Sequence, residues 1–244
     1  MDKPSFVYEE EDAKGQEILE AISAAGTFNK WMYGTIRPFC EGRILEIGSG
    51  VGNISSFFIH EGATLALSDI REGYREKLKK QFPKQPVYNI DIVDPEFALH
   101  QKELLGTFDT CFALNVVEHV ENDALAIRNM LQLLKPGGRL IILVPAYQWL
   151  YNPIDTSLGH YRRYTQHSLG ELMKVHGALE KLFSFNFTGI AAWWMGGKLF
   201  RQDTIPKGEM KLYNTFVPVF KIVDKLVLNK AGLSVIGVLK KKAN

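Results

Sequence analysis

The sequence predicts an α/β protein built on a doubly wound, mostly parallel sheet. Short apolar strands alternate with amphipathic helices over residues 43–144, a pattern typical of parallel sheets covered by helices on both faces. A glycine-rich turn follows the first strand, at the edge where open α/β sheets bind ligands. The KPGG segment at residues 135–138 ends the last helix of this region before its final strand.

Each expected element is short, as alternating strands and helices require. Two amphipathic helices, at residues 12–23 and 27–37, precede the first strand. Five strands then follow, at residues 43–47, 64–68, 87–90, 108–114 and 139–144. The helices between them are expected at residues 53–60, 72–81, 95–104 and 122–134. After residue 144 we expect a polar and aromatic stretch, a helix at 168–176, a strand at 179–187 and a final strand at 233–239.

The chain is expected to form a single domain. Its 244 residues are enough to bury a sizeable apolar core. The segment 188–232 is far longer than ordinary connections of ~4–6 residues, so we expect it to fold as a cap over the substrate. The remaining parts are an N-terminal helical lid at 1–41, the core at 42–187, and the final strand and tail at 233–244.

Composition argues against several classes of function. A net charge of +2 is too near neutral to indicate a nucleic-acid partner. The two cysteines, Cys40 and Cys111, support neither a disulfide framework nor a cysteine metal cluster, and no metal site is predicted. The acidic start of the chain lacks a signal-peptide core, and no apolar run approaches the ~20 residues of a membrane span. We therefore expect a cytoplasmic location.

The glycine turn indicates the kind of ligand. Residues 44–53 read ILEIGSGVGN, with Gly48, Gly50 and Gly52 at alternate positions. Glycine allows positive φ angles and close approach of the backbone to a ligand. The third glycine comes one residue earlier than in the dinucleotide pattern G-x-G-x-x-G, and the carboxylate of Glu46 would repel a pyrophosphate. A ligand with a cationic amine and a sulfonium suits this turn, although a glycine turn without a ligand remains the alternative.

The chain resembles the class I S-adenosylmethionine (SAM) dependent methyltransferases over residues 31–143 and the terminal strand. The segments that carry the resemblance, in order along the chain, are ILEIGSGVGN, LALSDI, NIDIVD, FALNVVEHV and LKPGGRLIILVP. The resemblance implies a seven-stranded sheet whose last strand is antiparallel and lies between the fifth and the sixth. It also implies SAM as the cofactor and S-adenosylhomocysteine as the product.

Cofactor-binding residues follow from this resemblance and from their chemistry. Asp69 ends the second strand, where its carboxylate can accept hydrogen bonds from ribose hydroxyls, although aspartate also caps helices. Asp91 and the Ile92 amide match the family's adenine contact, although an ordinary turn aspartate fits nearly as well. Trp31 and Tyr33 are candidates for a lid over the cofactor, although core packing explains a tryptophan equally well. The full set of candidates is Glu46, Gly48, Gly50, Gly52, Asn53, Asp69, Ile70, Asp91, Ile92, Asn115, Trp31 and Tyr33.

Two histidines are candidate catalytic residues. His119 belongs to an E-H-V motif, which opens the helix after the fourth strand in related methyltransferases. An ordinary histidine pKa of ~6.5 suits a general base at neutral pH. His160 lies in the polar segment after the fifth strand and is the second candidate base. The alternative is that His119 caps or packs the end of a helix.

Substrate contacts are expected from the same polar segment and from the cap. Tyr161, Arg162 and Arg163 follow His160, and paired guanidinium groups can hold a carboxylate or a phosphate. The alternative is a network of arginine and aspartate that fixes the loop. Trp193 belongs to the apolar segment IAAWWMGGKLF, which suits an acceptor pocket, a membrane surface, a dimer interface or ordinary core packing.

The sequence therefore predicts transfer of the SAM methyl group to an oxygen or nitrogen of a small-molecule, glycan-like or lipid-like acceptor. We expect a monomer or homodimer with no nucleic-acid partner and no transmembrane segment, and peripheral membrane contact stays open. Two alternatives remain, a non-catalytic SAM-binding partner protein and an NAD-dependent oxidoreductase. The glycine spacing and Glu46 disfavour the oxidoreductase.

Overall fold

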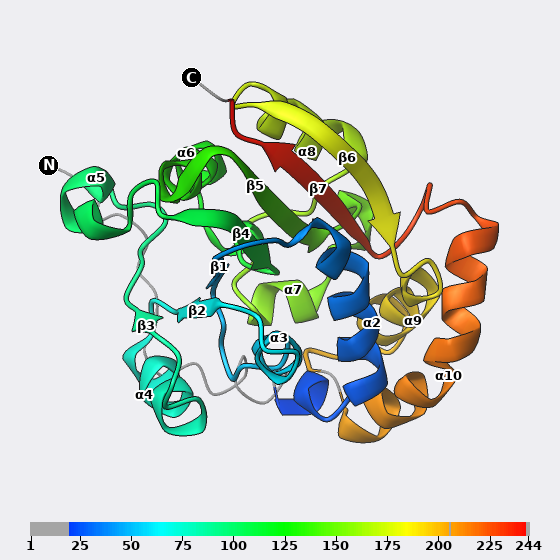
Figure 1. The fold of residues 1–244 in the computed structure, drawn as a ribbon. Coiled ribbons are helices and arrows are strands. Elements are labelled where there is room, and N and C mark those ends of the chain that lie inside the picture. The colour runs from blue at the N-terminus through cyan, green and yellow to red at the C-terminus, as the bar shows by residue number, and fades with distance from the viewer. Residues whose placement is uncertain (1–19, 205, 243–244) are drawn as a thin grey trace, which may run out of the picture.

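A computed structural model describes residues 20–204 and 206–242 and confirms the predicted sheet (Figure 1). Its seven strands have the order β3-β2-β1-β4-β5-β7-β6. The last strand runs antiparallel to both of its neighbours, as the family resemblance implied, and the other adjacent pairs are parallel. The strands are β1 Ile44–Ile47, β2 Leu65–Ser68, β3 Val87–Tyr88, β4 Phe108–Leu114, β5 Leu134–Pro145, β6 Ala178–Phe185 and β7 Ser234–Lys240.

Helices cover both faces of this sheet. They are α2 Gly26–Ile36, α3 Ser55–His60, α4 Glu72–Gln81, α5 Phe97–His100, α6 Asp123–Leu133, α7 Pro153–Ser157, α8 Gln166–Lys174, α9 Gly189–Trp194 and α10 Lys207–Leu226. Short 3-10 turns lie at Arg37–Phe39, Lys102–Leu104, Val117–His119 and Gln148–Leu150, and a π-helical turn at Met195–Leu199. Of the helix expected at 12–23, residues 20–23 are helical and the rest lies outside the described residues.

The core consists of two apolar layers, one on each face of the sheet. All four residues of β1 are buried, as expected for a central parallel strand. Leu45 and Ile47 join the layer that contains Met130 of α6, whereas Ile44 joins the layer that contains Phe58 of α3. The alternation along β1 therefore places the side chain of Glu46 on the α3 side of the sheet.

Two expected elements differ from the structure. The KPGG segment ends α6 as predicted, but β5 already begins at Leu134 and includes it. The Gly138 carbonyl accepts the N–H of Lys241, the residue after β7, at 2.8 Å, and the Gly137 N–H donates to the Lys241 carbonyl at 3.2 Å. A Cβ on Gly138 would lie 2.9 Å from the Asp109 carbonyl oxygen, so this turn lies within the sheet. The helix expected at 95–104 is instead the short α5 followed by a 3-10 turn.

The segment after β6 has a structure of its own, as its length predicted. Figure 1 shows α9 and α10 gathered beside α2, at the side of the sheet where β6 ends. Buried Asp224 of α10 accepts the backbone N–H groups of Asn186, at 2.6 Å, and Phe187, at 2.7 Å. These bonds fix α10 to the chain that leaves β6. None of the helices in the described residues has the length and apolar character needed to cross a bilayer.

Candidate functional site

The glycine loop leaves β1 in a conformation that only glycine adopts readily. Gly48, Gly50 and Gly52 have φ angles of 68°, 54° and 79°. A Cβ on Gly48 would lie 2.6 Å from Cγ2 of Val116, and one on Gly52 would lie 2.5 Å from the ring of Phe82. Backbone conformation and lack of space therefore both require glycine at the first and third of these positions.

Asp69 joins the glycine loop to the end of β2. Its carboxylate is buried and accepts the N–H groups of Gly50, at 2.9 Å, and Arg71, at 3.0 Å. The N-cap residue of α4 is Arg71, so Asp69 does not cap that helix. Burial raises the pKa of the Asp69 carboxyl above its ordinary value. The neighbouring carbonyl of Ile70 accepts a hydrogen bond of 2.5 Å from Arg75.

Glu46 is a second buried carboxyl group under the glycine loop. It accepts a hydrogen bond from the hydroxyl of Ser55 at the start of α3. Burial raises the pKa of Glu46 to about 8, the Ser55 bond opposes this, and the nearby Asp69 carboxyl adds to the increase. A cation beside these two carboxyl groups would favour the ionised form of Glu46.

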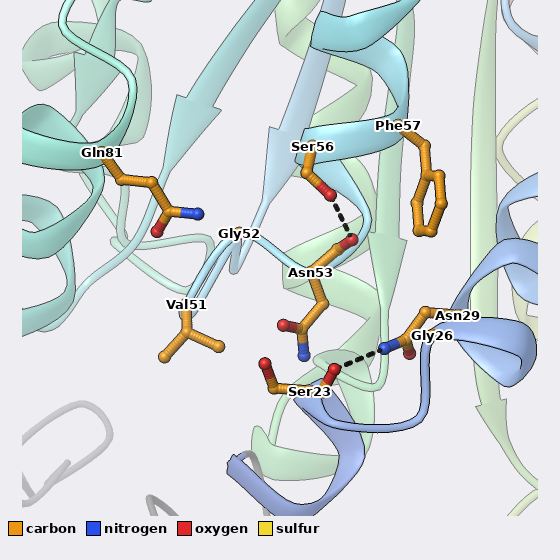
Figure 2. Close-up of a pocket in the computed structure, with 9 residues that line it drawn as sticks. All are labelled: Ser23, Gly26, Asn29, Val51, Gly52, Asn53, Ser56, Phe57 and Gln81. Atoms are coloured by element: carbon orange, nitrogen blue, oxygen red, sulfur yellow. Dashed lines mark hydrogen bonds between the residues drawn. The ribbon is translucent and has the colours of Figure 1, made fainter. Parts of the chain in front are cut away.

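A pocket of about 340 Å³ lies beside the glycine loop, between the loop and helices α2 and α3 (Figure 2). Gly52 and Asn53 line it, and the Asn53 carbonyl accepts a 2.9 Å hydrogen bond from the Ser56 hydroxyl. The glycine loop therefore lines this pocket, whereas Asp69 and Asn115 at the carboxyl edge of the sheet do not. The other lining residues, which the sequence did not indicate as site residues, are Ser23, Gly26, Asn29, Val51, Ser56, Phe57 and Gln81.

The chain after β4 turns sharply at Asn115. This residue has a φ of 54°, which asparagine tolerates better than most side chains, and its N–H donates to the Leu143 carbonyl at 2.9 Å. The first two residues of the E-H-V motif, Glu118 and His119, end a 3-10 turn at Val117–His119. The motif does not open a helix, since α6 begins only at Asp123. This turn places Glu118 and His119 directly after the carboxyl end of β4.

Asp91 and Ile92 follow β3 and form a tight turn. Asp91 is partly buried, and its carboxylate accepts the N–H of Val93 at 2.9 Å. The side chain of Asn129 on α6 donates to the carbonyls of Ile92, at 3.0 Å, and Asp94, at 2.9 Å. Asn129, which the sequence did not indicate, thus holds this loop against the core.

The two candidate bases lie side by side although they are distant in the sequence. The loop after α7 lies against the E-H-V turn, because the N–H of Tyr161 donates to the Glu118 carbonyl at 2.8 Å. The rings of His119 and His160 meet edge to face, with centroids 4.7 Å apart. Nε2 of His160 lies 3.9 Å from Oε1 of Glu118, and its Nδ1 lies 2.7 Å from Oδ1 of Asp155. We call Glu118, His119 and His160 the histidine cluster.

Buried Asp155 holds this cluster in place. Its Oδ1 also accepts a 2.8 Å hydrogen bond from Arg163 Nε, and its Oδ2 accepts the N–H of Asn152 at 3.0 Å. The guanidinium of Arg163 donates to the Ala146 carbonyl at 3.0 Å and lies 4.6 Å from the centre of the Trp193 ring. The cap thereby contacts the loop that carries His160.

Comparison with known proteins decides the family. Residues 16–178, more than half of the chain, match the family model of the methyltransferase domain. The chain belongs to the class I SAM-dependent methyltransferases. SAM is therefore its cofactor.

Curated relatives of this methyltransferase match over part of their length. The mitochondrial ubiquinone biosynthesis O-methyltransferase of Schizosaccharomyces pombe is 30% identical over 100 residues, which cover 41% of this chain and 36% of that protein. The ubiquinone/menaquinone biosynthesis C-methyltransferase UbiE of Cronobacter sakazakii is 26% identical over 175 residues, 64% of each protein. The chain thus spans less than two thirds of either relative. A solved SAM dependent methyltransferase from Archaeoglobus fulgidus shares the fold, with a TM-score of 0.55, 17% identity and coverage of 87% and 94% of the two chains.

The two lid candidates of the methyltransferase lie in its core. The ring of Trp31 packs against Phe185 with centroids 4.4 Å apart, and the ring of Tyr33 stacks on Phe57 at 5.3 Å. Both side chains are buried in the apolar layer on the α3 face, as the core-packing alternative expected for tryptophan. Neither lines the pocket of Figure 2, whereas Gly26 and Asn29 of the same region do.

The predicted arginine pair of the methyltransferase is divided between two acids. Arg163 binds Asp155, whereas Arg162 binds Asp123 at 3.0 Å and the Glu121 carbonyl at 2.6 Å. These contacts are those of the loop-fixing network that the sequence left open. Tyr161 is exposed, and Nε1 of Trp193 is buried without a hydrogen-bond partner. A role in acceptor binding for Tyr161, Arg162, Arg163 and Trp193 stays a prediction.

The raised pKa of Glu46 predicts that SAM binding depends on pH. In the free methyltransferase this carboxyl is protonated well below pH 8. The sequence predicts a contact between Glu46 and the cofactor, and a SAM ammonium group bound there would lower this pKa. Binding should then release a proton, and affinity should rise up to about tenfold between about pH 6 and pH 7, where an α-amino group is still charged. Calorimetry in two buffers of different ionisation enthalpy measures both effects. The Glu46→Gln variant should bind without proton release, and a pH-independent affinity in the unaltered protein would contradict the contact.

Proposed function

We propose that the methyltransferase transfers the methyl group of SAM to a hydroxyl oxygen of a small, apolar or lipid-like acceptor. The observation that carries this proposal is the histidine cluster beside the end of β4. A neutral hydroxyl is a weak nucleophile until its proton leaves, whereas a neutral amine attacks with its own lone pair. Two imidazoles and a carboxyl group at the reacting end of the site suit the hydroxyl.

We assign the cofactor to the carboxyl edge of β1, β2, β3 and β4. Asp69 suits the ribose, because each carboxylate oxygen can accept a further hydrogen bond beyond those from Gly50 and Arg71. Glu46 suits the amino group, and Asp91 with the Ile92 amide suits the adenine. The methyl group then lies near Asn115, from which the 3-10 turn leads to His119. The remaining members of the assignment are Gly48, Gly50, Gly52, Asn53 and Ile70.

The main task of the protein in methyl transfer is to align the reacting atoms. The sulfonium of SAM makes its methyl carbon electrophilic, so the protein must bring oxygen, carbon and sulfur into line and exclude water. In the transfer, the oxygen to carbon bond forms as the carbon to sulfur bond breaks, and the acceptor proton is lost at the histidine cluster. S-adenosylhomocysteine and a methyl ether are the products.

We assign the acceptor to the space between the histidine cluster and the cap at residues 188–232. The Trp193 ring against Arg163 links α9 to the loop that carries His160. The cap is rich in apolar side chains, including exposed Trp194 and Phe200, which suits an apolar acceptor. The fission-yeast relative is named for O-methylation in ubiquinone biosynthesis, which is consistent with such an acceptor.

The proposal is tested by the identity of the product. The protein is incubated with SAM carrying a ¹³C-labelled methyl group and with fractionated extract or hydroxylated quinone precursors. The ¹³C chemical shift of the product methyl group distinguishes methoxy, N-methyl and C-methyl groups. We expect a methoxy signal that is absent with the Asp69→Ala variant. An N-methyl or C-methyl product, or SAM binding with no labelled product from any fraction, would contradict O-methylation.

A further inference from the structure

We propose that Glu118, His119 and His160 bind a divalent transition-metal ion. One ligand atom from each residue lies within 4.8 Å of the other two. Two imidazoles and one carboxylate form the ligand set of catalytic zinc sites and of non-haem iron sites, both of which keep open positions for further ligands. The composition did not indicate this site, because its ligands are not cysteines.

The buried carboxyl group of Glu118 is the independent observation. The residue is 0% exposed, and neither of its side-chain oxygens has a hydrogen-bond partner. Arg163, a nearby cation, instead directs its guanidinium to Asp155 and to the Ala146 carbonyl. Buried carboxyl groups are normally paired or bound to a metal. An ion between Glu118 and the imidazoles would supply the missing partner.

His160 has the outer contact that metal-binding histidines need. Asp155 lies 2.7 Å from Nδ1 of His160, which keeps the proton on Nδ1 and leaves Nε2 as a ligand atom facing Glu118. The ring of His119 lies edge to face against that of His160, with centroids 4.7 Å apart. Metal-bound histidines characteristically donate their second N–H to a carboxylate or a backbone carbonyl, which fixes the orientation of the ring.

The ligand atoms must move closer together to hold an ion. Ligand atoms at ~2.0 Å from a tetrahedral ion lie ~3.3 Å apart. The 3.9 Å separation between His160 Nε2 and Glu118 Oε1 must therefore shorten by roughly half an ångström, and separations of up to 4.8 Å within the cluster by up to roughly 1.5 Å. The two imidazoles favour Zn²⁺, Fe²⁺ or Co²⁺ over Mg²⁺ and Ca²⁺, which prefer oxygen ligands.

The ion would have a direct use in the proposed O-methylation, and this part of the inference rests on that function. A hydroxyl bound to a divalent ion loses its proton near neutral pH. In that case the imidazoles would be metal ligands and not bases, so the proton would leave to water instead of to the histidine cluster. The oxygen would be held near Asn115, where we place the methyl group. Metal binding itself does not depend on the identity of the acceptor.

Titration of the chelator-treated protein with Co²⁺ or Zn²⁺ alone tests the site. We expect one ion per chain, and a visible Co²⁺ absorption band that reports imidazole ligands. Glu118→Gln and His160→Ala should each weaken binding at least 100-fold, and Asp155→Asn by about 10-fold to 100-fold. His167→Ala is the matched control, because His167 is 85% exposed and outside the cluster, and it should bind normally.

Two results would overturn the inference. One is the absence of stoichiometric binding to the unaltered protein, and the other is binding that neither Glu118→Gln nor His160→Ala weakens. Retained SAM affinity shows that a variant is folded. An O-methylated product formed at full rate after complete removal of the ion would overturn the catalytic role of the metal while leaving O-methylation in place. A C-methyl or N-methyl product with one bound ion would instead contradict only the proposed function.

Discussion

Replacement of Asp69 by alanine is expected to weaken SAM binding about 100-fold, or about 2.7 kcal/mol. The carboxylate orders the glycine loop through Gly50 and the start of α4 through Arg71, and we assign the ribose hydroxyls to its remaining lone pairs. Hydrogen bonds to a charged, buried group are among the stronger contacts in proteins. Calorimetry with SAM and with S-adenosylhomocysteine measures the loss.

Asp109→Ala is the matched control for Asp69→Ala. Asp109 also accepts a backbone N–H, from Arg43 at 2.8 Å, and it pairs with Lys135, but it lies near the amino end of β4. Its loss should lower the melting temperature without changing SAM affinity. If Asp69→Ala binds SAM as tightly as the unaltered protein, the ribose assignment is wrong.

Replacement of His160 by alanine is expected to lower kcat at least about 100-fold while SAM affinity changes less than about twofold. The Nδ1 of His160 is held by Asp155 at 2.7 Å, which directs its Nε2 toward Glu118, 3.9 Å away. The contacts of His160 lie on the side of the site that we assign to the acceptor. Initial rates are measured with labelled SAM and the acceptor that the product experiment identifies. SAM affinity, measured separately, distinguishes an effect on turnover from an effect on binding.

Two further variants define the result for His160. His167 is exposed and lies outside the histidine cluster, so it serves again as the control, and His167→Ala should retain the full rate. Asp155→Asn keeps the shape of the side chain but weakens its interaction with His160, so an intermediate rate is expected. A His160→Ala variant with the full rate would remove the histidine cluster from the mechanism.

The glycine loop and the sheet were predictable because their causes are local or belong to the family. Three glycines at alternate positions after a buried strand already require positive φ angles and close packing, and the structure has both at Gly48 and Gly52. Strand order, in contrast, could not be predicted from the residues of the strands themselves. The insertion of β7 between β5 and β6 came from the resemblance, since the periodicity of a strand does not name its neighbours.

Contacts between distant segments were beyond the sequence. Both histidines were candidate bases on their own chemistry, but their edge-to-face contact depends on how the loop after α7 returns to the end of β4. The sequence alone could not show that Glu118 and Asp155 lie beside His160, because this depends on the same contact between the two loops. Trp31 and Tyr33 were predicted to lie over the cofactor but are buried in the core. The sequence could not show this, because the side of α2 that faces the core depends on packing against β6 and α3.

The position of bound S-adenosylhomocysteine in a crystal structure tests the central claim most directly. The account predicts that the ribose hydroxyls contact the Asp69 carboxylate and that the sulfur atom lies near Asn115, facing His119 and His160. A complex in which the cofactor occupies the pocket between α2 and α3, with Asp69 and Asn115 out of contact, would contradict it.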